Sequence, residues 1–240
     1  MAYTNSPLVS YTKLSPNHSG QRTHSIDRIT PHCVVGQCSV ETLGNVFLPK
    51  SRQASSNYGI GVDGRVGMYV EEKNRSWCSS SASNDQRAVT IECASDSKAP
   101  YAFKDVVYNK LIELCTDICK RNGKTRLLWL GDKDKTLGYT PAPDEMVLTV
   151  HRWFANKSCP GDWMYARMGD LAEKVTAALG GQTQAPLDNA PAAWSKDAVN
   201  WALENRLLLG DANGDLKLRE NLTREQFCVM LKRYHDLLQK

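Results

Sequence analysis

The segment VHRWFANKSCPG, residues 150–161, brings three reactive side chains close together in the chain: His151, Lys157 and Cys159. It continues from MVLTV, residues 146–150, an apolar run typical of a buried strand. An imidazole, an ammonium and a thiol just beyond a strand have two interpretations. Either they pack there by chance, or two of them hold a metal ion and the third faces the group on which the metal acts.

The composition is that of an ordinary globular protein: of 240 residues, 41% are hydrophobic and 23% are charged. No stretch approaches the ~18 consecutive apolar residues that a membrane span needs, and the N-terminal residues show no apolar signal-peptide core. We therefore expect folding in a cytoplasm and no membrane partner. The net charge of +4, without a dense basic stripe, does not predict nucleic-acid binding.

The eight cysteines lie mostly in apolar surroundings. Without a signal peptide, free thiols are favoured over a disulfide framework. Cys115 and Cys119 are four residues apart on a predicted helix, a spacing that also suits a metal pair. We favour the simpler interpretation, two small core residues on the buried face.

The first part of the chain mixes strands and helices. RITPHCVVG predicts a buried strand ending near His32, and SVETLGNVF a short helix capped by Ser39 or Thr42. SSNYGIGVDGRVGMYV predicts a hairpin turning at Asp63-Gly64, because both residues tolerate positive φ. A strand at 88–93, an amphipathic helix at 102–120, the strand at 146–150 and a helix from 162 to the glycines at 180–181 complete this part.

The polar, proline-bearing run QTQAPLDNAP then predicts a linker, followed by helices alone. We predict an α/β (α+β) fold: a mixed central sheet flanked by helices, then a small all-helical domain. The expected boundaries are 1–180, a linker at 181–190, and 191–240.

A catalytic zinc usually has three protein ligands and one open position. His151 and Cys159 can supply two ligands if the loop between them folds back. Among the other four histidines, His32 alone closes an apolar strand, which makes it the natural third ligand. Each histidine could equally be a structural residue, so these residues by themselves leave the metal and the packing interpretations open.

Together the segments resemble the zinc-dependent N-acetylmuramoyl-L-alanine amidases of type 2, which share their fold with peptidoglycan recognition proteins and many phage endolysins. The resemblance covers about residues 29–179, in the right order. It implies His32, His151 and Cys159 as zinc ligands. Lys157 matches the family's lysine two residues before the third ligand, and SCPG resembles the usual ending of this motif.

The hairpin also matches the family, with one departure. Some members carry a catalytic tyrosine just before it, where this chain has Ser56. Others use a glutamate on the next strand, and NDQRAVTIECAS places Glu92 there. We therefore expect Glu92 to be the general acid and base, with a structural ion pair as its alternative role. Tyr58 is expected to pack in the core or to form a wall of the substrate pocket.

The resemblance implies a peptidoglycan hydrolase that cleaves the amide between N-acetylmuramic acid and L-alanine with a zinc-activated water. Glu92 would take the proton of the water and pass it to the leaving amine, while Lys157 would face the developing oxyanion. A cysteine hydrolase with Cys159 as nucleophile and His151 as base is an alternative, but it leaves His32 without a role. A non-catalytic peptidoglycan-binding module is another.

Residues 194–227, WSKDAVNWALENRLLLGDANGDLKLRENLTREQF, resemble one S-layer homology motif, a module that binds secondary cell-wall polysaccharide. The resemblance makes Arg224 the candidate contact for an anionic wall sugar. DANGD suggests a calcium loop, but Leu216 and Leu222 stand where such a loop needs Gly and Glu, so calcium is rejected. A helical dimerisation hairpin is the alternative for this region.

Such motifs usually occur three to a chain, and only one is found here, so we expect a homo-oligomer formed through residues 191–240. An amidase without a signal peptide, joined to a wall-binding unit, resembles a phage endolysin. Such a protein is stored in the cytoplasm of the host bacterium until it is released to the cell wall. A bacterial autolysin is the alternative, and it would normally carry an export signal.

Overall fold

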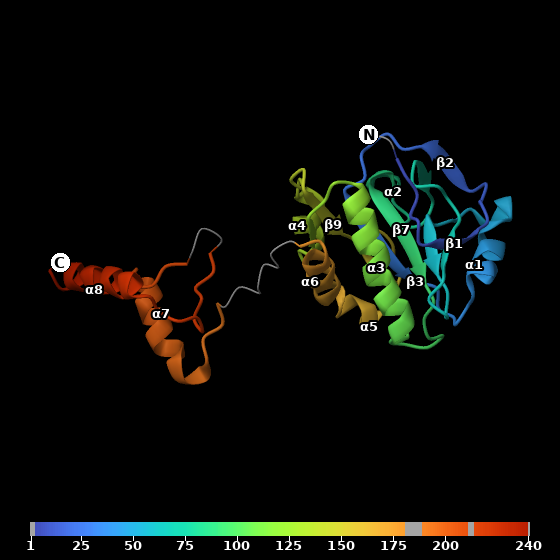
Figure 1. Ribbon diagram of the computed structural model, residues 1–240. Helices are drawn as coiled ribbons and strands as arrows, with labels where there is room; N and C mark the ends of the chain where they lie inside the picture. The colour runs from blue at the N-terminus through green and yellow to red at the C-terminus, as the bar shows by residue number, and fades with distance from the viewer. Residues whose placement is uncertain (1–2, 181–188, 211–213, 240) are drawn as a thin grey trace. The chain divides into compact units, whose positions relative to one another are not determined.

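The computed structural model describes residues 3–180, 189–210 and 214–239. The chain divides into two compact units, Met1–Thr183 and Gln184–Lys240, and each is described by itself. Most of the predicted linker, residues 181–188, lies outside the described residues. The predicted fold class is confirmed, because the first unit is a mixed sheet flanked by helices and the second contains helices (Figure 1).

Seven strands form the main sheet of the first unit. Their spatial order is β1 (Val9–Thr12), β5 (Val66–Met68), β4 (Tyr58–Ile60), β7 (Ala88–Cys93), β3 (Arg28–Cys33), β9 (Glu145–Leu148) and β8 (Arg126–Leu128). All neighbouring pairs are parallel except β4 and β5. A separate two-stranded antiparallel sheet consists of β2 (His18–Gln21) and β6 (Asn74–Ser76).

The antiparallel pair β4–β5 is the predicted hairpin. Tyr58 is paired with Met68, and the chain turns at Asp63-Gly64 as expected. Gly64 has φ +81°, in the left-handed region where a side chain is unfavourable. The Asp63 carboxylate accepts a hydrogen bond from the amide of Arg65, which stabilises the turn.

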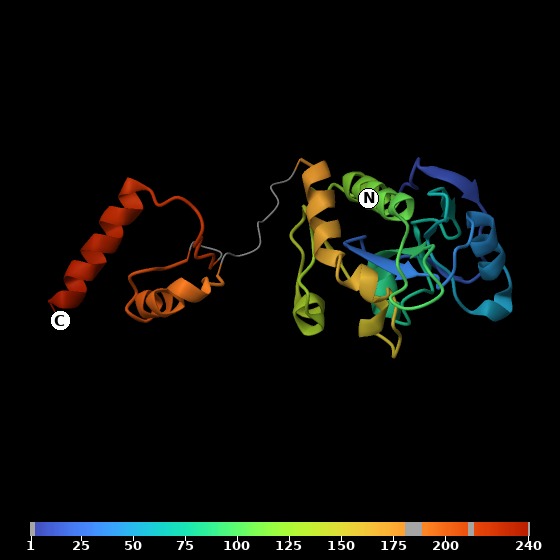
Figure 2. The same cartoon turned by 90° about the horizontal axis from the view of Figure 1, so that it is seen from below.

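The central strands β3 and β7 present different chemistry on their two faces. Ile29 and Ile91 belong to the main hydrophobic core, together with residues of α3 (Asp105–Arg121) and α6 (Met168–Ala178). Figure 2 shows these two helices on the same side of the sheet. Because side chains alternate along a strand, His32 and Glu92 point to the opposite face. The core therefore lies on one side of these strands and polar groups on the other.

The remaining helices of the first unit are short. They are α1 (Val40–Phe47), η1 (Lys50–Arg52), α2 (Ala82–Arg87), α4 (Lys133–Gly138), η2 (His151–Trp153) and α5 (Asp162–Tyr165). The predicted cap of α1 is Ser39, whose hydroxyl accepts a hydrogen bond from the amide of Thr42. The single helix predicted from residue 162 is instead two, α5 and α6, because Arg167 leaves helical geometry with φ −106° and ψ 5°.

All eight cysteines are free thiols, as expected. Cys115 and Cys119 are fully buried on α3 in the main core, which confirms their packing role.

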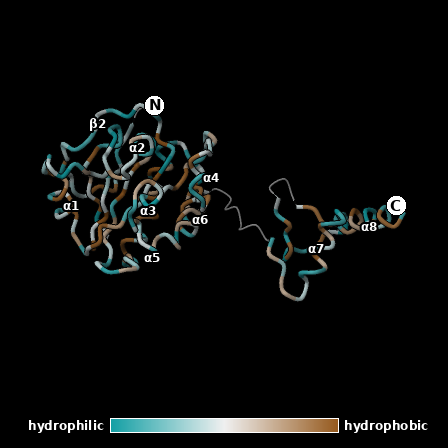
Figure 3. Tube along the Cα trace, turned by 180° about the vertical axis from the view of Figure 1, so that it is seen from behind, coloured by the Kyte–Doolittle hydropathy of each residue, from teal (hydrophilic) through white to brown (hydrophobic). Residues whose placement is uncertain are grey.

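The second unit contains η3 (Ala193–Ser195), α7 (Lys196–Glu204) and α8 (Arg224–Leu238). Thr223 caps α8 as predicted, in a reciprocal capping box with Gln226. Leu207 is the only buried side chain among the described residues of this unit, and Trp194 is 91% exposed. Brown, hydrophobic segments are visible along α7 and α8 in Figure 3. None of the helices in the described part of the chain is long and apolar enough to cross a membrane.

Candidate active site

The candidate site lies where parallel strands of the main sheet end. In the register of β3 and β7, His32 is the direct partner of Glu92. Neighbouring residues in parallel strands point to the same face, so the two side chains lie next to each other on the polar face. In open sheets of this kind, sites form at the carboxyl ends of parallel strands. The topology therefore places an imidazole and a carboxyl group together at such an edge.

A proline helps to open the sheet at this edge. Strand β9 pairs with β3 only along Arg28 and Ile29. Pro31, two residues further along, has no amide hydrogen to donate to a neighbouring strand. Beyond Leu148 the chain leaves the ladder and enters η2, whose first residue is His151. The second predicted ligand thus comes from the strand beside His32, as the sequence suggested.

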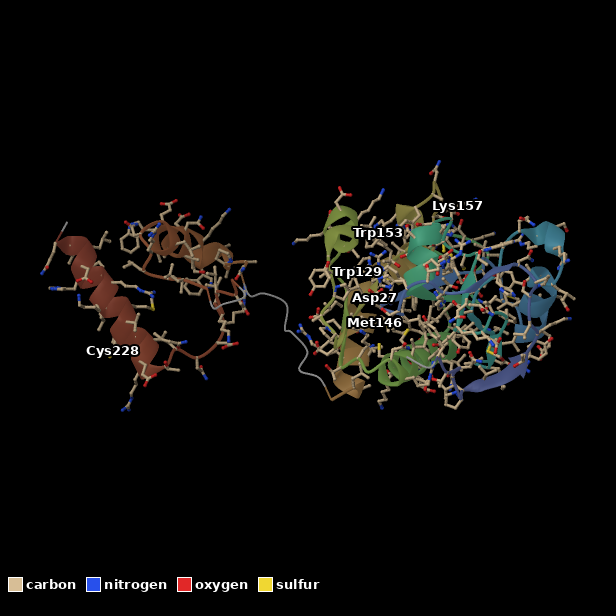
Figure 4. The ribbon with its side chains drawn as sticks, turned by 90° about the horizontal axis from the view of Figure 1, so that it is seen from above. Asp27, Trp129, Met146, Trp153, Lys157 and Cys228 are labelled. Atoms are coloured by element: carbon tan, nitrogen blue, oxygen red, sulfur yellow. The ribbon has the colours of Figure 1, made fainter. Side chains whose placement is uncertain are left out.

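The loop after η2 folds back on itself, which the pairing of His151 with Cys159 requires. The amide of Arg152 donates to the carbonyl of Cys159 at 3.1 Å, which closes the loop. On η2, Trp153 stacks on Trp129 with ring centroids 5.1 Å apart and planes 3° from parallel. Figure 4 shows these two side chains close together, and Lys157 on the loop near the surface of the first unit. The loop is therefore held from both ends.

The structure brings the three predicted metal ligands together. The Cys159 Sγ lies 3.3 Å from the His32 Nδ1, and the rings of His32 and His151 have centroids 5.1 Å apart. One ligand atom from each of the three residues lies within 4.8 Å of the other two. A second group with the same property shares His32 and contains Cys78 and Glu92.

The donor set and its burial fit a zinc ion. Two imidazoles and one thiol are a ligand combination found in catalytic zinc sites, which leave one position open. His32 Nε2 is buried and has no hydrogen-bond partner among the described residues. Burial, and secondarily His151, hold the pKa of His32 well below its ordinary value of 6.5, so the ring is neutral and able to bind a metal.

Cys159 does not have the properties of an activated nucleophile. The neighbouring Cys33 thiol, burial and Glu92 all raise the pKa of Cys159 well above its ordinary value of 9.0. A nucleophilic cysteine needs a lowered pKa and a base within hydrogen-bond reach. The hydrogen-bond partner of His151 Nε2 is the Ser80 hydroxyl, at 3.0 Å, and the ring nitrogen beside Cys159 belongs to His32. The geometry therefore disfavours the cysteine hydrolase with His151 as the base of Cys159.

Glu92 is a partly buried acid that forms no salt bridge among the described residues. Its Oε2 is buried and has no hydrogen-bond partner, while its Oε1 accepts a weak hydrogen bond from the Cys78 thiol at 3.8 Å. Burial raises the pKa of Glu92 to about 7, although Cys78 and Arg52 act in the opposite direction. The structural ion pair that was the alternative for this residue is not present. A carboxyl group that titrates near neutrality is suited to exchange protons.

Glu92 and Lys157 open into one cleft of about 610 Å³. The residues lining it are Phe47, Arg52, Gln53, Ala54, Ser55, Arg75, Trp77, Cys78, Ser80, Ala82, Asp85, Glu92, His151 and Lys157. Lys157 lies close enough to His151 to lower the pKa of that imidazole, a smaller effect than burial. The carboxyl group of Glu92, the ammonium of Lys157 and one candidate ligand, His151, therefore face the same space.

A buried hydrogen-bond network supports the polar face beneath the site. Asn84, on α2, donates from its side-chain amide to the hydroxyl of Thr30 at 3.1 Å. Its carbonyl oxygen accepts from the hydroxyl of Thr149 at 3.1 Å, and the two threonine hydroxyls are 2.7 Å apart. Thr30 and Thr149 lie two residues before the candidate ligands His32 and His151. The network thus joins α2 to both chain segments that carry the imidazoles.

Two other predicted site residues lie elsewhere. Tyr58 is fully buried in the main core, where its hydroxyl donates to Glu72 at 2.6 Å and accepts from the amide of Ser6. It does not line the cleft, so of the two roles expected for it the structure favours packing. Arg224 is the exposed first residue of α8, in the second unit.

The sequence did not indicate three polar neighbours of the predicted residues: Cys78, Ser80 and Arg52. Cys78 and Ser80 belong to the run SWCSSSAS between β6 and α2, whose polar composition indicates only a loop. Arg52 is an exposed residue of η1. Only the tertiary structure shows that these residues lie beside Glu92 and His151.

Comparison with known proteins identifies the family. A family model described as N-acetylmuramoyl-L-alanine amidase matches residues 17–162, more than half of the chain. A crystal structure of a selenomethionine derivative of AmpD is similar, with a TM-score of 0.50 and 16% identity over 72% of this chain and 99% of that chain. No curated protein sequence matches the chain.

Two further solved structures are less similar in geometry. The N-acetylmuramoyl-L-alanine amidase LysC from Clostridium intestinale has a TM-score of 0.44 and 16% identity, over 76% of this chain and 96% of that chain. PlyL has a TM-score of 0.48 and 14% identity, over 69% of this chain and 95% of that chain.

Proposed function

Since this chain belongs to the N-acetylmuramoyl-L-alanine amidase family, we propose that it is a peptidoglycan hydrolase that cleaves the amide between N-acetylmuramic acid and L-alanine. The observation that carries the proposal is the cluster of His32, His151 and Cys159 beside a buried carboxyl group, Glu92, at one cleft. A non-catalytic binding module would not need an acid without a counter-ion next to three metal-ligand side chains, because such a group costs stability.

The metal site in this proposal is formed by His32, His151 and Cys159. A zinc ion bound there supplies Lewis acidity, which lowers the pKa of an attacking water and polarises the scissile carbonyl. The hydrogen bond between the Ser80 hydroxyl and His151 Nε2 orients the second imidazole, and His32 is neutral, as a metal ligand must be. Binding of the metal also requires Cys159 to lose its proton, so metal affinity is expected to rise with pH.

The other groups move protons and stabilise charge. Glu92 accepts a proton from the attacking water and delivers it to the leaving amine of L-alanine, which suits a carboxyl group with a pKa of about 7. Lys157 faces the cleft and places its ammonium near the oxyanion that develops on the carbonyl oxygen. The charge of that oxygen grows in the transition state, so Lys157 contributes to turnover more than to substrate binding.

Mass analysis of digested cell walls tests the reaction. Intact stem peptides that begin with a free L-alanine are expected, because only cleavage of this amide releases them. One zinc per chain is expected by metal analysis, and His32→Ala and Cys159→Ser should each abolish both metal binding and turnover. Full lytic activity after chelation to near-zero metal would contradict the zinc mechanism. Wall binding without any release of peptide would favour the non-catalytic module.

For the second unit we propose attachment to secondary cell-wall polysaccharide, with Arg224 contacting an anionic sugar. The resemblance of residues 194–227 to an S-layer homology motif supports this role, as does the exposed position of Arg224. We further propose a phage endolysin with catalytic residues at 1–180 and wall-binding residues at 191–240, held in the cytoplasm of the host until lysis. A bacterial autolysin is the alternative origin.

A further inference from the structure

The cleft beside Glu92 carries more positive charge than the proposed reaction uses. Three cationic side chains line it: Arg52, Arg75 and Lys157. The mechanism gives a role to Lys157 alone. Among the described residues, none of the three forms a salt bridge. Two arginines thus line the cleft next to the candidate base without a salt-bridge partner among the described residues.

Two acidic residues line the same cleft, Glu92 and Asp85, and among the described residues neither forms a salt bridge with the arginines. Asp85 is buried, and its carboxylate accepts hydrogen bonds from the amide of Cys78 at 3.0 Å and the hydroxyl of Ser79 at 2.5 Å. The amide of Ser79 donates to it as well. These donors belong to the loop before α2, and they occupy the carboxylate oxygens of Asp85. The charge that the cleft offers to a ligand is therefore positive.

Arg75 is the more firmly placed of the two arginines. It lies on β6, and its guanidinium donates to the hydroxyl of Ser19 on the partner strand β2. The indole of Trp77 donates to the same hydroxyl at 2.6 Å. The Nε of Arg75 is buried and has no hydrogen-bond partner among the described residues. A buried donor without a partner costs free energy that a ligand oxygen can recover.

Arg52 lies on η1 and also lines the cleft. It lies near enough to Glu92 to lower the pKa of that carboxyl group, in opposition to burial. A ligand held by Arg52 is therefore a near neighbour of the scissile bond. Guanidinium groups bind carboxylates through two parallel hydrogen bonds, and a lysine ammonium does not reproduce this geometry.

We infer that Arg52 and Arg75 form a subsite for a carboxylate on the peptide side of the scissile amide, so that the protein prefers stem peptides with a free acid group next to L-alanine. This inference rests on the proposed function, since it names a part of the same substrate. The residue after L-alanine in muramoyl peptides is D-isoglutamate or its amide, D-isoglutamine. The two differ by one carboxyl group, and the subsite distinguishes them.

Cleavage of two matched compounds tests the subsite: N-acetylmuramoyl-L-alanyl-D-isoglutamyl-L-lysine and its isoglutaminyl counterpart. In both, the lysine occupies the γ-carboxyl group, so only the α-carboxyl group differs at this residue. The wild-type kcat/KM is expected to be about tenfold or more higher on the acid, as for one charge-assisted contact. Arg52→Gln and Arg75→Gln should each bring the ratio toward one, and added salt should lower it. Lys120→Gln is the matched control, because Lys120 is an exposed cation on α3 and does not line the cleft.

Calorimetric binding of both compounds to the Glu92→Gln variant gives a readout without turnover. Tighter binding of the acid, lost in the double variant Glu92→Gln/Arg75→Gln, supports the subsite. If the acid binds more tightly but the wild type cleaves neither compound, the proposed reaction is wrong and the subsite is still supported. Equal affinity for acid and amide overturns the subsite, even if both are cleaved. Arg75→Lys should retain part of the preference, which separates loss of the contact from loss of the fold.

Discussion

Glu92 combines two properties at the residue scale: it is the strand partner of His32, and its Oε2 has no hydrogen-bond partner among the described residues. A buried carboxyl group of this kind lowers stability unless it is used or neutralised. Its pKa of about 7 allows it to accept and to release a proton near neutral pH. Both the proposed catalytic role of Glu92 and its effect on the free energy of unfolding can be tested by substitution.

Glu92→Gln should fold and bind zinc but lose activity by at least ~10²-fold, the effect typical of a lost general base. Lys157→Ala should lower kcat while the metal content stays at one zinc per chain. Ser56→Ala is the control, because Ser56 occupies the family's tyrosine position and its hydroxyl donates to the carbonyl of Tyr58. Normal turnover by Glu92→Gln together with inactivity of Ser56→Ala would move the catalytic role to the hairpin.

In metal-free protein, the contribution of Glu92 to stability should fall as the pH rises from about 4.5 to about 7. The pKa of Glu92 is about 7 in the folded chain, against an ordinary value of 4.5, so the folded state keeps this proton over a range where the unfolded state releases it. The full cost, of the order of 3 kcal/mol, is present above that range and absent below it. Urea unfolding of chelated wild type and Glu92→Gln measures the free energy of unfolding of both proteins. The variant should become increasingly more stable than the wild type as the pH rises through this range. A difference between the two free energies that does not change with pH would contradict the prediction.

At the scale of elements, three strand ends and one short helix make the site. Strands β3 and β7 present His32 and Glu92, and the chain after β9 supplies His151. Helix α2 has only six residues, too few to be stable by itself, and is joined to the sheet by the hydrogen bonds of Asn84. We therefore expect the positions of His32 and His151 to depend on this helix. Asn84 itself contacts neither of them.

Asn84→Ala should lower the free energy of unfolding by about 1–3 kcal/mol, because it removes one hydrogen bond from each of the buried hydroxyls of Thr30 and Thr149 and leaves them only each other. Activity should fall as well, since both segments carrying imidazoles lose a common support. Ser83→Ala, an exposed change on the same helix, is the matched control and should alter neither property. Denaturant unfolding and turnover measured on both variants check this. An Asn84→Ala protein as stable as the control would show that the network does not hold α2.

At the scale of the whole molecule, the two units differ in how they bury apolar surface. The first has a continuous core beneath its sheet, whereas Leu207 is the only buried side chain described in the second. The exposed apolar side chains of α8 include Phe227, Val229, Leu231 and Leu238. A unit of 57 residues with so little core is near the size where association is usually needed for stability.

We predict that full-length protein is oligomeric through residues 191–240 and binds cell walls more strongly than residues 1–181. Several copies on one polymer would turn a modest affinity at each site into strong retention. Light scattering and wall pull-downs on both proteins measure this, and turnover of a soluble muramoyl peptide by residues 1–181 is the control for folding. A monomeric full-length protein that binds walls no better than the shorter form would end the proposal.

The sequence by itself determined the features that depend on neighbouring residues. Short apolar runs placed β3 and β7, Asp63-Gly64 placed the hairpin, and Thr223 placed the start of α8. These signals are local, because strand period, turn geometry and capping involve residues within a few positions of one another. Family resemblance then named the residues of the cluster, including Glu92.

The tertiary structure decided what lies around those residues. It brought Cys159 to His32 across 127 positions, buried Tyr58 away from the cleft, and placed Arg52 and Arg75 on its walls. It also divided the predicted helix after residue 162 into α5 and α6. None of this follows from spacing, because burial and the shift of a pKa depend on which distant segments pack together, and parallel strands are joined only through long crossovers.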